Sequence, residues 1–367
     1  MPKILLVTND FGPRAGGIET FIIGLLERIP RGEVLVYTSR QEDYEDHDRV
    51  WLENYGVEVI RDCTKILLPT PRVIRILRRL IAKRDIEVIW FGAAAPLGLS
   101  SRWLKLAKVK RIVALTHGHE VWWAKLPPFS WLVREISRGV DHFGYLAEYT
   151  ANELARVIPR SKLTKIAPGI DIEHFKWKTV EKRRPTIISV GRLVHRKGQD
   201  KLVEALPIIK REIPDVELIF VGEGPHRKEL DRLVKKYELE SSVRFIGRVN
   251  YKELPSYFAL GDVFAMPSRS RLFGLEVEGL GIVYLEASAC GLPVIAGNSG
   301  GAPDAVLEGE TGFVVDGNNI DEIATRAIEL LSNPDLCKKF GERGRRWVEE
   351  EWHWDIWSKR FNTLLRQ

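Results

Sequence analysis

Residues 186–221, TIISVGRLVHRKGQDKLVEALPIIKREIPDVELIFV, are the part of the chain from which the architecture is most directly predicted. Two apolar runs rich in β-branched residues, Ile187–Val190 and Val216–Val221, flank a loop with two glycines and a stretch with helical spacing. Near-continuous apolar strands separated by helices are typical of parallel sheets covered by helices on both faces. The stretch therefore predicts a strand-loop-helix-strand unit of an α/β domain.

The same alternation continues in both directions along the chain. In the first half the apolar runs are Ile4–Val7, Val34–Tyr37, Val57–Ile60, Val88–Phe91, Ile112–Leu115 and His142–Leu146. In the second half the further runs are Val243–Ile246, Val263–Met266, Pro293–Ala296 and Phe313–Val315. Two such series predict an α/β chain with two Rossmann-like domains, each with a doubly wound parallel sheet. A length of 367 residues suits two domains.

A change in composition marks the expected domain boundary. The turn at 168–171 is followed by the polar, basic stretch Glu173–Arg184, so we expect a linker at about 171–185. The predicted domains are residues 1–171 and 172–351. Residues 352–367 predict an amphipathic C-terminal helix with three tryptophans.

Composition limits the classes of protein to which the chain can belong. No apolar run approaches the roughly 20 residues of a membrane-spanning helix, and the N-terminus starts directly with a strand pattern. Three scattered cysteines indicate neither a disulfide framework nor a zinc site. We therefore expect a soluble, cytoplasmic protein. Its formal charge of +6 favours anionic partners.

A glycine-bearing loop, NDFGPRAGGIET, follows the first predicted strand and opens a helix. Gly16 and Gly17 would let the backbone approach an anion at the start of that helix. Their spacing differs from the dinucleotide motif G-x-G-x-x-G. A phosphate contact and a purely structural turn both fit this loop.

Two carboxylates lie eight residues apart in EGLGIVYLE, residues 278–286. Gly279 and Gly281 are expected at the start of the helix that contains Glu286. Glu278 in the loop and Glu286 in the helix could then bracket a diphosphate at the helix N-terminus. Carboxylates also accept hydrogen bonds from sugar hydroxyls. The alternative is two unrelated glutamates on one helix.

Two further loops carry polar side chains at the ends of predicted strands. Arg192 and Lys197, in the loop at 191–198, could neutralise a diphosphate without a metal, or belong to a basic surface loop. His117 follows the strand at 112–115 and could contact a sugar hydroxyl, or be a core histidine. A metal pair in His-Gly-His is disfavoured because no further ligands occur at useful spacing. The triplet Asp46-His47-Asp48 is expected in a solvated loop.

Together these motifs resemble the retaining GT-B glycosyltransferases of family 4. The pair Glu278/Glu286, the run GRLVHRKGQD and the glycine loop occur in the order of that family. The longer segments THGHEV, DVFAMPSRSR, EVEGLGIVYLEASACGLPVIAG and SGGAP resemble its bacterial members that transfer mannose from GDP-mannose to phosphatidylinositol mannoside. The resemblance covers nearly the whole chain.

The resemblance implies a fold and a reaction. It implies two Rossmann-like domains around a deep interdomain cleft, with an acceptor-binding first domain, a donor-binding second domain and a C-terminal helix that crosses back onto the first. It implies transfer of a hexose, with GDP-mannose as the donor substrate, to a lipid-linked or glycan acceptor, without metal or other cofactor. Transfer would occur on the front face of the sugar.

The same resemblance implies roles for individual residues. Arg192 and Lys197 would contact the diphosphate, Glu278 and His117 the transferred hexose, and Glu286 the ribose. The remaining donor contacts would come from the glycine loop with Gly16 and Gly17, from Arg248 and Val249 beside the base, and from the backbone of Gly279, Leu280, Gly281 and Ile282. The chain departs from the family pattern at 270–275, where Leu272-Phe273 replaces a glycine-rich stretch.

A basic amphipathic helix is expected at 71–84, PRVIRILRRLIAKR. One face would carry Val73, Ile74, Ile76, Leu77, Leu80 and Ile81. The other would carry Arg72, Arg75, Arg78, Arg79 and Lys83, with no acidic residue. This pattern predicts contact with an anionic membrane surface or a core-packed helix with a solvated face, and both can hold.

A group of aromatic residues around Pro127-Pro128 suits a membrane interface, sugar stacking or a core. Trp122, Trp123, Phe129 and Trp131 are expected in a loop. A transferase of the same fold that uses a UDP- or ADP-sugar, and a GT-B-like sugar-nucleotide epimerase, are alternatives. Nucleic-acid binding is disfavoured because the basic segments lack interleaved aromatic residues.

Overall fold

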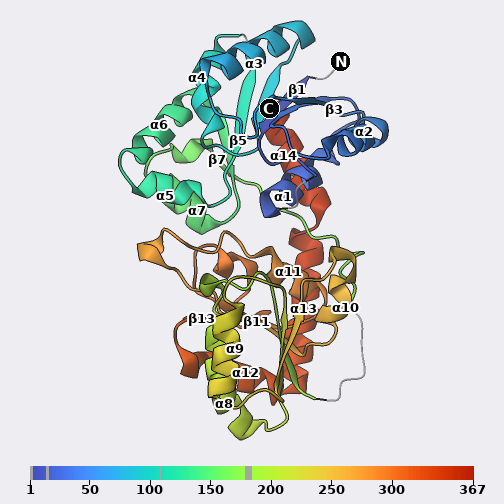
Figure 1. The fold of residues 1–367 in the computed structure, drawn as a ribbon, viewed down its shortest axis with the longest axis vertical. Coiled ribbons are helices and arrows are strands. Elements are labelled where there is room, and N and C mark those ends of the chain that lie inside the picture. Colours follow the sequence, from blue (N-terminus) through green and yellow to red (C-terminus); the bar gives the residue numbers. More distant parts are fainter. Residues whose placement is uncertain (1–2, 14–15, 108, 178–183) are drawn as a thin grey trace. The chain divides into compact units, whose positions relative to one another are not determined.

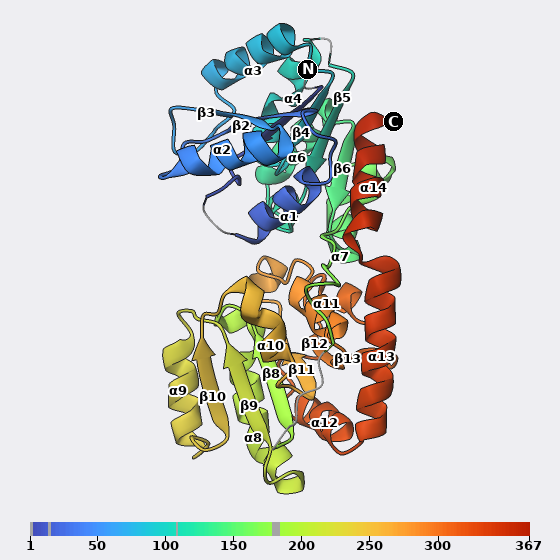
Figure 2. The same ribbon diagram turned by 90° about the vertical axis from the view of Figure 1, so that its right-hand side faces the viewer.

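Two parallel sheets organise the chain in the computed structural model, which describes residues 3–13, 16–107, 109–177 and 184–367 (Figures 1 and 2). One unit comprises Met1–Gly169 together with Trp354–Gln367, and the other comprises Ile170–His353. The two doubly wound sheets predicted from the sequence are confirmed. Of the expected linker, residues 178–183 lie outside the described residues.

The first sheet has seven strands in the order β3-β2-β1-β4-β5-β6-β7. The strands are β1 (Ile4–Thr8), β2 (Val34–Thr38), β3 (Glu58–Arg61), β4 (Val88–Phe91), β5 (Arg111–Leu115), β6 (His142–Tyr145) and β7 (Leu163–Lys165). Strand β1 pairs in parallel with both β2 and β4, which places Ile4 opposite Val34 and Val88. The chain therefore winds outward from β1 in both directions, as in other doubly wound folds.

Alternation along the strands directs apolar side chains to both faces of this sheet. On one face, Leu5 and Val7 of β1 belong to a core with helices α3 (Pro71–Arg84), α4 (Ser101–Lys105) and α6 (Phe129–Gly139). On the other face, Ile4 and Leu6 pack with α1 (Gly17–Leu26), α2 (Tyr44–Tyr55) and α14 (Trp354–Arg366). Shorter helices α5 (Glu120–Lys125) and α7 (Glu148–Leu154) complete the unit.

The C-terminal helix α14 is part of this first unit, beside α1 (Figure 1). Its Phe361 ring lies 4.7 Å from the ring of Trp90, the centre of β4, and both side chains are fully buried. Leu365 is also fully buried. The last helix of the chain thus fills the core of the first unit.

The second sheet has six parallel strands in the order β10-β9-β8-β11-β12-β13. They are β8 (Thr186–Val190), β9 (Glu217–Val221), β10 (Val243–Gly247), β11 (Val263–Met266), β12 (Val294–Gly297) and β13 (Gly312–Val315). The α-helices are α8 (Gln199–Glu212), α9 (Arg227–Lys236), α10 (Leu254–Phe258), α11 (Ile282–Ala289), α12 (Ile320–Leu331) and α13 (Pro334–Glu351). The chain adds strands on one side of β8 and then on the other, so the strand order reverses between β8 and β11. Folds of this kind bind ligands at that position.

All twelve predicted apolar runs contain a strand, and one strand was missed. Strand β7 has three half-buried residues and ends in Lys165, so it lacks the apolar run on which the prediction depends. Two local predictions were wrong. The four aromatic residues expected in a loop lie in α5 and α6, and Asp46-His47-Asp48 lies in α2, where Asp48 pairs with Arg61.

Helix α3 has the bounds predicted for it. Val73, Leu77 and Ile81 are buried, and Ile74, Ile76 and Leu80 pack against the same core. The apolar face therefore points into the first unit. In the described part of the chain, no helix combines the length and apolar character needed to cross a membrane.

Candidate active site

The side chains of Lys197 and Glu278 meet in the second unit, with the lysine Nζ 2.8 Å from the glutamate Oε2. Their side chains are 10% and 8% exposed, so this is a buried ion pair. Lys197 ends a short 3-10 turn at 195–197 after β8, and Glu278 lies in the loop before α11. Because a buried charge is stable only when it is paired, each side chain fixes the position of the other.

Two backbone hydrogen bonds hold Glu278 in place. Its N–H donates to the hydroxyl of Ser299 at 3.2 Å, and its carbonyl accepts from the N–H of Gly301 at 2.9 Å. Both partners belong to the segment after β12. The carboxylate is thus carried by a loop that is tied to a central strand.

Helix α11 begins at Gly281, whose left-handed backbone, with φ 75°, requires glycine. A Cβ there would also lie 2.3 Å from the ring of Tyr284. That tyrosine is fully buried, and its hydroxyl bonds the Met266 carbonyl at 2.7 Å, which fixes the helix against β11. The first N–H groups of such a helix lack helical partners and favour an anion.

Glu286, inside α11, is buried, and burial raises its pKa to about 7, with Lys197 acting in the opposite direction. Burial raises the pKa of Tyr251, and the negative charge of Glu286 raises it further. The Tyr251 ring stacks 4.6 Å from that of His174. A carboxyl that titrates near neutral pH in a buried position is typical of a functional site.

The loop at 191–198 carries two cationic side chains in different environments. Arg192 is exposed, and Lys197 is buried with Glu278. The loop ends at Gly198, with φ 73°, where a Cβ would lie 1.9 Å from the Pro267 carbonyl oxygen. The glycine lets the loop pass close to the end of β11.

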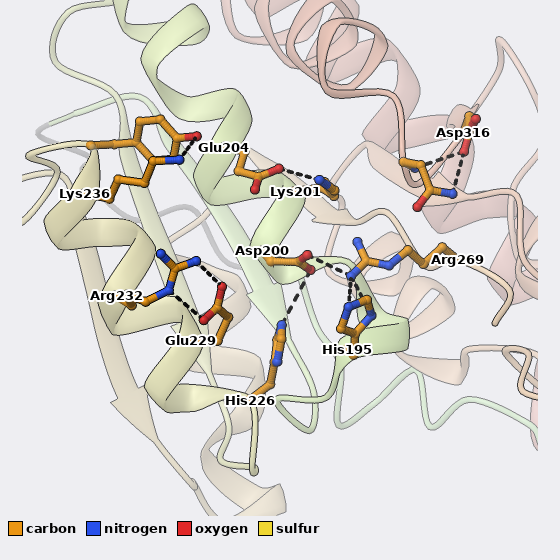
Figure 3. Close-up of polar contacts among 12 residues, drawn as sticks. His195, Asp200, Lys201, Glu204, His226, Glu229, Arg232, Lys236, Arg269 and Asp316 are labelled. Atoms are coloured by element: carbon orange, nitrogen blue, oxygen red, sulfur yellow. Dashed lines mark hydrogen bonds and ion pairs between the residues drawn. The ribbon is translucent and has the colours of Figure 1, made fainter. Parts of the chain in front are cut away.

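A buried arginine that the sequence did not reveal connects this loop to two other elements (Figure 3). Arg269, 4% exposed, donates from Nη2 to Asp200 Oδ2 and to His195 Nδ1, each at 2.7 Å. Its backbone N–H donates to the carbonyl of Arg196 at 2.8 Å. The segments after β8 and β11 and the first turn of α8 are therefore fixed together, next to Lys197.

Replacing Arg269 by methionine is expected to lower the free energy of unfolding by about 3–5 kcal/mol, because it removes the guanidinium that pairs with buried Asp200. Arg271→Met is the matched control. Arg271 is 37% exposed and pairs with Glu276, so we expect a loss below about 1 kcal/mol. Urea unfolding measures both values, and equal losses in the two variants would contradict this assignment.

Arg248 and Val249 follow β10 and line a pocket of about 420 Å³. Glu223, Asn250 and Tyr257 complete much of its polar wall. A glutamate and an asparagine beside an arginine offer both acceptors and donors. The pocket therefore offers hydrogen-bond donors and acceptors to a polar ligand.

His117 lies in the first unit, directly after β5. Its Nε2 donates to the Gly92 carbonyl at 2.6 Å, and its backbone N–H donates to Glu120 at 2.9 Å. Burial lowers the pKa of His117, which keeps the ring neutral with Nδ1 as an acceptor. No group of three or more metal-ligating side chains gathers among the residues that the structure describes.

Gly16 and Gly17 form the exposed start of α1. A Cβ at either position would meet no atom within 4 Å. Packing within the unit therefore does not explain these glycines. Arg14 and Ala15 of the same loop lie outside the described residues.

The segment that departs from the family pattern forms an exposed tip. Leu272 and Phe273 both have left-handed backbones, with φ 49° and 56°, and both are exposed. The backbones of Arg271 and Glu276 bond to each other beneath them. The structure thus assembles Lys197, Glu278 and Glu286 in the second unit, with Arg192 on the same loop as Lys197.

Two family models match the chain, one in each of the two units. The family model described as Glycosyltransferase Family 4 matches residues 15–174, and the one described as Glycosyl transferases group 1 matches residues 171–347. The second match contains all six strands of the second sheet, and the first contains the strands of the first sheet except β1.

Relatives match the chain over its full length. The GDP-mannose-dependent alpha-(1-6)-phosphatidylinositol monomannoside mannosyltransferase of Mycolicibacterium smegmatis is 42% identical, over 99% of this chain and 98% of that protein. The corresponding enzyme of Corynebacterium glutamicum, described for the monoacylated monomannoside, is 39% identical over 99% and 98%. Among solved structures, sucrose-phosphate synthase from Thermosynechococcus elongatus has a TM-score of 0.80 at 22% identity, over 100% and 99% of the chains, which shows a shared fold.

Proposed function

The chain belongs to the glycosyltransferases of group 1 and Family 4, and on that premise we propose that it transfers mannose from GDP-mannose to a phosphatidylinositol mannoside. Two of its full-length relatives, at 42% and 39% identity, carry names that state this donor and this class of acceptor. The proposal includes retention of configuration at the transferred sugar and independence from metal ions. In it, the second unit binds the donor and the first binds the acceptor.

The observation that carries the proposal is the buried pair of Lys197 and Glu278 beside the start of α11. A diphosphate seated at that helix start would receive peptide N–H groups and the Lys197 ammonium. Lysine has three N–H donors, so it can hold a phosphate oxygen while it holds Glu278. Exposed Arg192 supplies a second cation from the same loop.

The remaining donor contacts are part of the same proposal and are those that the family resemblance implies. Glu278 accepts from a hydroxyl of the hexose, and Glu286 accepts from the ribose hydroxyls. The pocket beside Arg248 and Val249 takes the base. His117 offers its Nδ1 to a hydroxyl of the hexose, and Gly17 lets the backbone of α1 approach a phosphate.

In the proposed reaction the acceptor hydroxyl attacks the anomeric carbon on the face from which the diphosphate departs. The bond between that carbon and the phosphate oxygen breaks as the bond to the acceptor oxygen forms. The acceptor proton passes to the departing phosphate. Negative charge grows on the diphosphate during this step, and Lys197 and Arg192 stabilise it.

A donor panel tests the proposal directly. The protein is melted with GDP-, UDP- and ADP-sugars in the presence of EDTA, and GDP-mannose is expected to raise the melting temperature most, because a ligand specific for the native state stabilises it. NMR of the product then reports the anomeric configuration. Preference for a UDP-sugar would refute GDP-mannose as the donor. Activity that requires added magnesium would refute independence from metal ions.

The acceptor is a lipid, and helix α3 offers a surface for an anionic membrane. Arg75, Arg78, Arg79 and Lys83 are exposed on it, whereas its apolar face packs inward. We place the protein in the cytoplasm at the inner face of the membrane. Three cysteines scattered along the sequence suit that reducing compartment.

The double variant Arg75→Gln/Arg79→Gln is expected to bind vesicles that contain phosphatidylinositol about 30-fold more weakly, at about 1 kcal/mol per basic residue. Co-sedimentation measures this binding, and added salt should weaken it in the wild type. Lys339→Gln/Arg346→Gln, two exposed charges on α13, is the matched control. Equal binding to neutral and anionic vesicles would contradict the role of charge.

A further inference from the structure

A groove of about 890 Å³ runs along α14 in the first unit, and none of the residues that line it is among the proposed donor contacts. We propose that it is a second anion site, which binds a phosphate ester or free phosphate. The proposal is independent of the identity of the donor. It rests on the charge, the hydrogen-bonding capacity and the shape of the groove.

The charged side chains that line the groove are all basic. Its lining includes the basic side chains of Arg111, His142, Lys165, Lys359 and Arg360, and none of the residues assigned to the lining is acidic. Arg111 and His142 begin β5 and β6, Lys165 ends β7, and Lys359 and Arg360 belong to α14. Cations gathered in a concave surface raise the local concentration of anions.

Two of these cations are already held in place. Arg111 donates from Nη1 to the Leu364 carbonyl at 3.2 Å, and the Arg360 guanidinium lies 4.7 Å from the centre of the Trp357 ring. A guanidinium has five N–H donors, so Arg111 keeps donors for a ligand. Within the described residues no carboxylate forms an ion pair with Lys359 or Arg360. Little reordering is therefore needed for these groups to bind an anion.

His142 supplies a second, independent observation. Its Nδ1 is buried and has no hydrogen-bond partner within the described part of the chain. Burial lowers the pKa of His142, and the positive charges of Arg111 and Lys162 lower it further. The negative charge of Asp141 acts in the opposite direction. A phosphate in the groove would offset the positive charge around the ring.

The shape of the groove suits more than a bare ion. It extends from Ile356 to Gln367, which is about 16 Å along a helix. Ile356 and Leu364 add apolar surface between the cations. A phosphate joined to an organic group, whether a soluble ester or a lipid headgroup, matches this combination.

The test uses the full chain saturated with GDP, so that the donor site is occupied. Inorganic phosphate and glycerol 3-phosphate are titrated at constant ionic strength, with the melting temperature as the measured quantity. Lys359→Gln/Arg360→Gln removes two cations of the groove, and Lys339→Gln/Arg346→Gln on α13 is the matched control. Wild type and control are expected to show saturable stabilisation, and the groove variant to need about tenfold more phosphate.

A second measurement keeps the test independent of how the variant folds. In the wild type, the NMR signal of the His142 ring is expected to shift with phosphate, and its pKa to rise. Vesicles of phosphatidylcholine with phosphatidylinositol separate the two sources. A loss of vesicle binding in the groove variant identifies a lipid headgroup, and unchanged vesicle binding identifies a soluble phosphate ester. Equal phosphate binding by wild type and groove variant, with no shift of His142, would overturn the proposal.

Discussion

The Lys197→Ala variant is expected to turn over about 10²–10³-fold more slowly than the wild type. Removal of one preorganised donor to a charge that develops in the transition state has an effect of this size. The ammonium that is lost lies 2.8 Å from Glu278, beside the start of α11. Single-turnover rates with saturating donor measure the effect on chemistry apart from donor binding.

Controls separate catalysis from stability, because Lys197→Ala also leaves the buried Glu278 carboxylate without its nearer cationic partner and with Arg196 Nε at 3.8 Å. Lys197→Ala/Glu278→Gln removes that unpaired charge, so it should recover stability without recovering turnover. Lys201→Ala, on α8, removes a lysine that pairs with Glu204 and should leave turnover unchanged. Near-normal turnover in Lys197→Ala would contradict the proposal that Lys197 stabilises the departing diphosphate.

The Glu286→Gln variant is expected to gain stability and lose donor affinity. In the wild-type native state the pKa of Glu286 is about 7, against an ordinary value of 4.5. The native state therefore binds more protons than the unfolded chain between these two values, and its stability falls as pH rises through that window. At pH 8 the substitution should raise the free energy of unfolding by on the order of 1–3 kcal/mol. Urea unfolding at pH 4 and pH 8 measures this, with little difference expected at pH 4.

Donor affinity should change in the opposite direction. Loss of a hydrogen bond to a charged group costs about 1.5–3 kcal/mol, so the KM for donor should rise about 10- to 100-fold in Glu286→Gln. In the wild type, donor affinity should rise with pH up to about 7, as the carboxylate forms, and this dependence should vanish in the variant. An unchanged KM with the same pH profile would remove Glu286 from the donor site.

The sequence predicted what depends on local pattern. Apolar runs located twelve strands because burial on both faces leaves a continuous apolar stretch. Helix α3 was predicted with its bounds because its apolar and basic spacing is local. The start of α11 followed from Gly279 and Gly281, of which Gly281 has a left-handed backbone that favours glycine.

Long-range pairing was not predictable. Arg269 bonds Asp200 and His195, which lie 69 and 74 residues away, and no spacing in the sequence connects them. A charged residue three positions beyond a buried strand was the available signal, and it was not used. The aromatic residues of α5 and α6 were placed in a loop because Pro127-Pro128 lies between them, yet a proline pair can equally separate two helices.

Helix α14 has a consequence for biosynthesis. The ribosome completes Met1–Gly169 before residues 354–367 exist, and at about 5–20 residues per second the interval is on the order of ten seconds or more. Throughout that time the face of Trp90 that later receives Phe361 has no cover. The nascent first unit must therefore wait, with an open hydrophobic surface that chaperones can recognise, until the residues of α14 have been synthesised.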